Sequence, residues 1–314
     1  MDVVSGMRCA VLMRFAVPVL VLLFTGLIVG SSQAQDLEPR YLTPAPVGLS
    51  FVSLGYTYST GAVLLDKTLP AEDVDAGIHT FVAAYGRSFD FVGDSARFEV
   101  IVPIADAVWD FQFAGVDSTA AKSGFGDPVL RFVWNFLGAP ALKAKEFMNF
   151  QSETTAGVVV RLRVPLGQYD SARFFNLGVN RWMFSPRFGV SHRMDRIVLE
   201  GYASVWFFTD NSDFLESNTL SQRSLYALQG HLVYRFRRGL WTSVSVGRAL
   251  GGETSVNGTP ADDASKDTRV GLSLALPISR QVATRLAWST SVTTRAGTDF
   301  STFGIALQYR WSGQ

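Results

Sequence analysis

The stretch S-T-F-G-I-A-L-Q-Y-R-W, residues Ser301 to Trp311, carries the pattern from which we infer the fold class. Large apolar and aromatic residues take every second position, and small or polar residues take the positions between them. This alternation suits a strand whose outer face meets lipid and whose inner face meets water, as in a transmembrane β-barrel. Gly304, Leu307, Tyr309 and Trp311 also match the C-terminal signal by which outer-membrane barrels are inserted. The last edge strand of a soluble β-sandwich would alternate in the same way, so the rest of the chain must distinguish the two.

The N-terminus predicts export. Arg8 and Arg14 precede an apolar run at 15–30, and small and polar residues follow up to position 34. We interpret residues 1–34 as a secretory signal peptide that is cleaved before Gln35. A single transmembrane anchor is the alternative, but the run is short for a span and no basic residues follow it. Cys9 is the only cysteine and precedes the run, so we expect neither a lipoprotein anchor nor a disulfide in the mature chain.

Composition narrows the class of protein further. The chain has 314 residues, 47% of them hydrophobic, and a formal net charge of +1. Such a balance gives no reason to expect a nucleic-acid partner. Beyond residue 35, no segment supplies the roughly twenty apolar residues that a membrane helix needs. An exported, apolar chain without a spanning helix is typical of an outer-membrane β-barrel.

Twelve alternating segments predict an all-β fold, a transmembrane antiparallel up-and-down β-barrel over residues 49–311. A short periplasmic lead at 35–48 precedes it, a tail at 312–314 follows it, and the last strand should pair back to the first. Tight turns at 93–94, 194–195, 238–239 and 278–279 alternate with long polar connections, as periplasmic turns and outer loops do. The long periplasmic connection 138–153 breaks this rhythm, and we expect a short helix at 141–147. The expected strands are 49–58, 78–91, 95–104, 128–137, 154–165, 179–192, 197–208, 223–237, 240–250, 267–277, 281–294 and 300–311.

Arginines dominate the polar positions that should face the lumen. Arginine stays charged in a partly dehydrated wall, where carboxylates or carbonyls can hold its fork of donors. One interpretation is a pore that favours anionic solutes, or electron-rich aromatic solutes through cation–π contact. The other is a network of arginines and carboxylates that braces or closes the lumen. The lumen-lining candidates are Arg97, Glu99, Arg131, Arg161, Arg163, Gln229, His231, Arg235, Arg269, Arg285 and Arg310.

The long connection 105–126 contains an apolar and aromatic segment at 108–114. We expect this segment to fold into the barrel and to narrow it. The candidates for this constriction loop are Trp109, Asp110, Phe111 and Phe113.

The histidines do not indicate catalysis. His79, His192 and His231 fall on different predicted strands, with no nucleophile beside them and no spacing typical of metal ligands. We therefore predict that the protein is not an enzyme and uses neither a cofactor nor a metal. A lipid hydrolase at the membrane rim remains a distant alternative, because it would need only a serine, a histidine and an acid there.

Several local segments, taken in order, resemble one known family. They are EPRYLTPAPVGLSF (38–51), GFGDP (124–128), GAPAL with KEF (138–147), PLGQYD (165–170), NLGVNRWMFSP (176–186), WFFTDNSDF (206–214), LQGHLVYRFRRGLW (228–241), LALP (274–277) and LQYRW (307–311). In these the chain resembles the outer-membrane transporters named for the MetA pathway of phenol degradation. The resemblance implies an outer-membrane barrel that takes up aromatic or other small hydrophobic compounds.

These expectations combine into one functional hypothesis. We expect a passive channel for small solutes in the outer membrane of a diderm bacterium. Its partners would be outer-membrane lipid and lipopolysaccharide, the barrel-assembly machinery and a small-molecule solute. A non-conducting structural or adhesive barrel is the alternative from another functional class.

Overall fold

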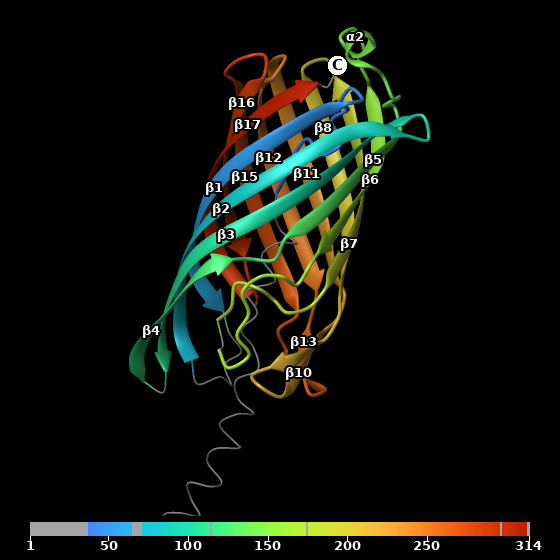
Figure 1. Ribbon diagram of the computed structural model, residues 1–314. Helices are drawn as coiled ribbons and strands as arrows, with labels where there is room; N and C mark the ends of the chain where they lie inside the picture. Colours follow the sequence, from blue (N-terminus) through green and yellow to red (C-terminus); the bar gives the residue numbers. More distant parts are fainter. Residues whose placement is uncertain (1–36, 65–70, 114, 174, 296, 313–314) are drawn as a thin grey trace, which may run out of the picture.

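The computed structural model describes residues 37–64, 71–113, 115–173, 175–295 and 297–312, so the predicted signal peptide lies outside the described residues. Within them the predicted fold is confirmed: twelve antiparallel strands form a closed β-barrel (Figure 1). The strands are β1 (Leu49–Leu64), β2 (Ala71–Phe91), β3 (Asp94–Phe113), β5 (Val129–Leu137), β6 (Thr154–Arg163), β7 (Met183–Met194), β8 (Ile197–Phe208), β11 (Leu225–Arg237), β12 (Leu240–Gly251), β15 (Ser265–Pro277), β16 (Val282–Thr293) and β17 (Gly297–Ser312).

Strand β17 closes the barrel by pairing with β1, as the opening stretch predicts. Leu307 lies opposite Leu54, and Trp311 lies opposite Ser50. The side chains of Leu54 and Leu307 are 66% and 48% exposed, whereas Gly304 in the alternate phase is buried. Apolar residues therefore cover the outside of the barrel at its seam, as a lipid-facing wall requires.

The two ends of the barrel differ. Tight turns join β2 to β3, β7 to β8 and β11 to β12 at the end that the sequence assigns to the periplasm. The long connection between β5 and β6 lies at this end and contains the expected short helix, α2 (Ala144–Phe147) (Figure 1). None of the helices in the described part of the chain is long and apolar enough to cross a membrane.

The outer end is more regular than the sequence suggests. Strand β3 continues to Phe113 and pairs with β4 (Val116–Phe125) to form a projecting hairpin. The prediction of an infolded loop is therefore wrong for residues 108–113, because the period-two alternation of β3 continues through them. Two other outer connections contribute β9 (Asn211–Phe214), β10 (Asn218–Gln222), β13 (Thr254–Val256) and β14 (Thr259–Pro260) to a second, four-stranded sheet.

The largest departure concerns the lead before β1. Its described part, residues 37–48, contacts side chains of the inner wall instead of lying in the periplasm. Gly48 donates its backbone N–H to Ser88 O at the periplasmic end, whereas Leu37 lies against Gly247 of β12 and Gly271 of β15. Tyr41 and Leu42 are only 4% and 1% exposed. The prediction of a periplasmic lead is thus wrong for residues 37–42, which ionic and aromatic contacts hold inside the barrel, whereas residues 45–48 contact its periplasmic end.

Candidate functional site

Four arginines from neighbouring strands converge inside the barrel and form what we call the arginine belt: Arg97, Arg131, Arg161 and Arg187. The strand register explains their proximity, because Arg131 lies opposite Glu99 on β3 and opposite Arg161 on β6. Glu99 is 2% exposed and forms ion pairs with both Arg97 and Arg131. The wall itself therefore contains an ion-paired network. Directly opposed arginines repel each other, so Arg131 and Arg161 favour a further anion between them.

The lead supplies that anion through Glu38. Its Oε2 accepts hydrogen bonds from Arg131 Nη1 at 3.0 Å and from Arg161 Nη2 at 2.9 Å. Burial alone would raise the pKa of this carboxyl, but the positive charges of Arg131 and Arg161 outweigh it and hold the pKa at about 2. Glu38 is consequently ionised across the physiological range and ties the lead to the wall.

Tyr41 places a phenol ring at the centre of the same belt. The guanidinium carbons of Arg131, Arg161 and Arg187 lie 5.0, 5.1 and 4.9 Å from its ring centroid. Arg131 Nη1 also donates to the Tyr41 hydroxyl at 2.8 Å. The ring of Tyr202 meets it edge-on, with centroids 6.0 Å apart. Each face or edge of the ring thus has a cationic or aromatic neighbour, the arrangement that favours cation–π attraction.

A second carboxylate, Glu200 on β8, holds the lead two strands along the wall from β6. The backbone N–H of Arg40 donates to Glu200 Oε2 at 2.7 Å, and Ser191 Oγ donates to Glu200 Oε1 at 3.1 Å. Arg97 Nη2 donates to the backbone carbonyl of Tyr41 at 3.3 Å. The lead therefore spans the interior between β3 and β8.

Glycines in the wall make room for the apolar side chains of the lead. A Cβ atom at Gly157 would lie 2.8 Å from Leu42 Cδ2, closer than real Cβ contacts. Similarly, a Cβ at Gly247 would lie 2.8 Å from Leu37 Cδ2, and one at Gly271 would lie 3.0 Å from Leu37 Cδ1. The inner surface of the barrel is therefore shaped to accept the lead.

Three other lumen candidates continue the polar inner wall on β11 and β15. Gln229 and His231 are buried on β11, and His231 Nδ1 lies 2.7 Å from Ser245 Oγ. Arg269 Nη2 donates to Phe300 O at 3.1 Å. In the strand register Gln229 lies opposite Tyr202, and the His231 ring lies 5.4 Å from the Tyr202 ring, so these two residues of β11 adjoin the belt.

The remaining arginines divide between the interior and the rim. Arg163 is buried at the outer end of β6, and Arg285 is close enough to Glu38 to lower its pKa. Arg235 is half-buried at the periplasmic end, where Arg310 is exposed and donates from Nε to Arg280 O at 3.2 Å. Only part of the predicted set is therefore brought together in one place.

An aromatic cluster lies nearer the outer end, around Trp109. Its indole stacks on Phe175, with centroids 4.8 Å apart and planes 16° apart, and Phe111 contacts Phe175 at 5.5 Å. Phe175 belongs to the connection between β6 and β7, so that connection enters the barrel. Asp110 faces away and accepts a hydrogen bond from Thr119, while Phe113 is half-buried at the end of β3.

Asp127, in the GFGDP segment, fixes this entering connection. Its Oδ1 accepts from the backbone N–H of Gly167 and its Oδ2 from that of Val179, both at 2.9 Å. The side chain is buried. One carboxylate thus joins both ends of the connection to the start of β5.

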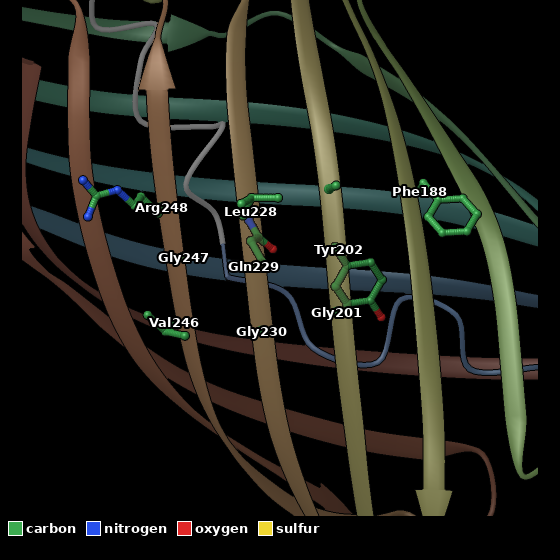
Figure 2. Close-up of a pocket in the computed structure, with 10 residues that line it drawn as sticks. Phe188, Gly201, Tyr202, Leu228, Gln229, Gly230, Val246, Gly247 and Arg248 are labelled. Atoms are coloured by element: carbon green, nitrogen blue, oxygen red, sulfur yellow. The ribbon is translucent and has the colours of Figure 1, made fainter.

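A groove of about 460 Å³ lies on the outside of the wall over Gly201 and Gly230. Figure 2 shows Leu228 and Val246 on neighbouring strands of the wall, with the blue coil of the lead crossing behind β11 and β8. Both side chains are exposed. The groove forms because Gly201 and Gly230 have no side chains to fill the outer face. It is separate from the arginine belt.

Among the described residues, no three histidine, cysteine or acidic side chains are grouped as metal ligands. His79 lies 2.8 Å from the Tyr56 hydroxyl, and His192 lies 2.8 Å from Thr154 Oγ1. His231 stands on a third strand, β11. The geometry therefore offers binding by arginines and aromatic rings, and no assembled acid–base pair around a histidine.

Comparison with known proteins identifies the family. The family model described as "Putative MetA-pathway of phenol degradation" matches residues 55–309. The chain belongs to this family. Among solved structures, it is similar to the COG4313 outer membrane channel from Pseudomonas putida F1, at 17% identity and a TM-score of 0.76, covering 88% of this chain and 100% of that one.

The transport unit of the autotransporter AIDA-I from Escherichia coli is a more distant match. It is 7% identical, with a TM-score of 0.53, and the alignment covers 88% of this chain and 95% of that one. No curated protein sequence matches the chain. At these identities the structural matches establish a shared barrel fold.

Sequence reasoning missed several residues of the site. Arg187 alternates with the outward-facing Phe184 and Phe188, a signal that would have placed it inside despite the proline at 186. Glu38 and Tyr41 lie in a segment without periodicity, so no local pattern could reveal their position.

Proposed function

We propose that this chain is a passive outer-membrane channel for small solutes, in which residues 37–48 close the middle of the lumen. The observation that carries the proposal is the way the interior is filled. A segment outside the barrel strands occupies the centre and is held by ion pairs, hydrogen bonds and the apolar contacts of Leu37 and Leu42. Such a segment can leave without disturbing the hydrogen bonds between the strands.

Barrel size supports the same conclusion. In eight-stranded barrels the side chains of the wall fill the interior, and the diameter grows roughly in proportion to the number of strands. Twelve strands therefore enclose more space than their own side chains fill. Departure of the lead would vacate this central space, where polar side chains such as Glu99, Arg161 and Gln229 belong to the wall.

The chemistry of the wall supports anionic or electron-rich aromatic solutes. The belt brings four guanidinium groups together around the lead, and the wall carboxylate of Glu99 forms ion pairs with two of them, Arg97 and Arg131. The excess positive charge attracts anions, and guanidinium groups bind aromatic faces. The family description refers to phenol degradation, and the Pseudomonas putida relative is described as a channel. The family description agrees with uptake of aromatic compounds, and the description of the relative agrees with a channel.

The proposal includes the cellular setting. The chain would be exported by the signal peptide at 1–34, inserted into the outer membrane by the barrel-assembly machinery, and surrounded by lipopolysaccharide in the outer leaflet. The separate positions of His79, His192 and His231 support a role without catalysis. Phospholipid turnover that is lost on replacement of His79 would instead identify a rim hydrolase.

Reversal potentials of purified protein in planar bilayers with a salt gradient test the proposal. We expect single-channel currents whose reversal potential is shifted toward the equilibrium potential of the anion. Cation preference would contradict the anion-selective wall. Absence of both current and solute flux into proteoliposomes would favour the non-conducting structural or adhesive barrel.

A further inference from the structure

We propose that the arginine belt is a binding site for one aromatic carboxylate, and that Tyr41 and Glu38 occupy this site in the closed channel as a tethered substitute for it. This inference rests on the proposed function and specifies its solute and its opening signal. A free aromatic acid would compete with the lead for the same guanidinium groups.

The geometry places a ring and a carboxylate side by side. Nη1 of Arg131 contacts both Glu38 Oε2, at 3.0 Å, and the Tyr41 hydroxyl, at 2.8 Å. Arg161 likewise holds Glu38 at 2.9 Å while its guanidinium carbon lies 5.1 Å from the Tyr41 ring. Two arginines thus serve a carboxylate and an aromatic ring at once. A benzoate-type anion carries these two groups in one small molecule.

Each group of such a ligand has a defined partner. Its carboxylate would take the donors of Arg131 and Arg161 that now bind Glu38. Its ring would replace that of Tyr41, near Arg187 and at the edge of Tyr202. Forked guanidinium groups bind planar carboxylates well and also stack on aromatic faces, which a lysine wall would do less well.

The same contacts exclude other solutes. An aliphatic acid would satisfy Arg131 and Arg161 but would offer no π face to the three arginines around the ring site. A neutral phenol would fill the ring site but would not replace the negative charge of Glu38 between Arg131 and Arg161. Because both halves are needed, the site discriminates by the combination of charge and aromaticity.

Because the solute competes with the lead for the belt, solute binding itself favours the open channel. Lead docking and solute binding are mutually exclusive, so a bound aromatic acid shifts the population toward the undocked channel. By linkage, the docked lead lowers the apparent affinity for the solute. That affinity equals the intrinsic affinity multiplied by the fraction of channels in which the lead is undocked.

Single-channel recordings in potassium chloride test the inference, with benzoate added and cyclohexanecarboxylate as a control of equal charge and similar size. We expect benzoate to raise the open probability severalfold and saturably, and cyclohexanecarboxylate to raise it much less. Equal effects of the two acids, or no effect of benzoate on a conducting channel, would overturn the inference and leave the proposed function intact.

Calorimetry on the detergent-solubilised protein tests binding independently of conduction. The Tyr41→Leu variant removes the competing ring and leaves the barrel wall unchanged, so it should bind benzoate at least threefold more tightly than the original chain. The gel shift of the folded barrel on heating verifies that the variant is folded. Unchanged or weaker binding by a folded Tyr41→Leu variant would refute the competition, whether or not the barrel conducts.

Discussion

Replacing Glu38 with glutamine should loosen the lead and raise the open probability of the channel. The carboxylate accepts two charge-assisted hydrogen bonds, from Arg131 and from Arg161. Each such bond is worth about 1.5–3 kcal/mol when buried. The Glu38 side chain is 34% exposed, so solvent screens part of this energy, and the glutamine oxygen can keep one weaker bond. The net loss is about 1–3 kcal/mol, which corresponds to a shift of roughly 5- to 150-fold in the docking equilibrium.

Single-channel recordings at fixed voltage and salt measure this shift directly. Glu153→Gln is the matched control, because it makes the same chemical change on an exposed residue of the periplasmic connection. The Glu38 variant should open at least several times more often, with the conductance of each opening unchanged. An open probability equal to that of the Glu153 variant would refute the role of the Glu38 ion pairs.

Two further predictions concern the membrane face and pH. Leu307→Arg should destabilise the folded barrel by about 2–4 kcal/mol if the residue lies near mid-bilayer, whereas Arg310→Gln at the exposed rim should change stability by less than about 0.5 kcal/mol. Urea titration in lipid vesicles compares the free energies of unfolding of the two variants. A Leu307 variant as stable as the original chain would contradict a lipid-facing outer wall. Because the pKa of Glu38 falls from its ordinary value of 4.5 to about 2 in the docked lead, its stabilisation of docking is complete above pH 4.5 and is lost as the pH falls toward 2. The open probability should therefore stay constant from pH 8 to 5 and rise below about 4.5. The Glu38→Gln variant should lack this rise. A Glu38-dependent change in open probability between pH 8 and 5 would contradict the low pKa of Glu38 in the docked lead.

The twelve strands were predictable because each one carries its own period-two pattern. In Ser301 to Trp311 the phase of the side chains alone gives the outward face, and the structure places Leu307 there. The hairpin of β3 and β4 escaped prediction because its second strand, β4, consists mostly of small and polar residues, a composition shared with loops.

The centre of the site depends on contacts that no local pattern contains. Glu38 meets Arg131 and Arg161, which are 93 and 123 residues away in sequence. The lead has prolines at 39, 44 and 46 and no period that would define a face. Arginines in the wall were predictable from strand phase, but the anion that joins them was not. Long-range ionic contacts, and not secondary-structure propensity, determine where this segment lies.

A reversible lock on the lead tests the central claim most directly. In the double variant Leu37→Cys and Gly247→Cys the two sulfurs should meet, since a Cβ at 247 would lie 2.8 Å from Leu37 Cδ2. Conductance of the same reconstituted sample is measured after oxidation and again after reduction. We predict that the oxidised protein, with its lead fixed to the wall, stays closed even with benzoate present, and that reduction restores conduction. Equal conduction by the oxidised and reduced forms, with the disulfide verified by mass spectrometry, would contradict a channel closed by residues 37–48.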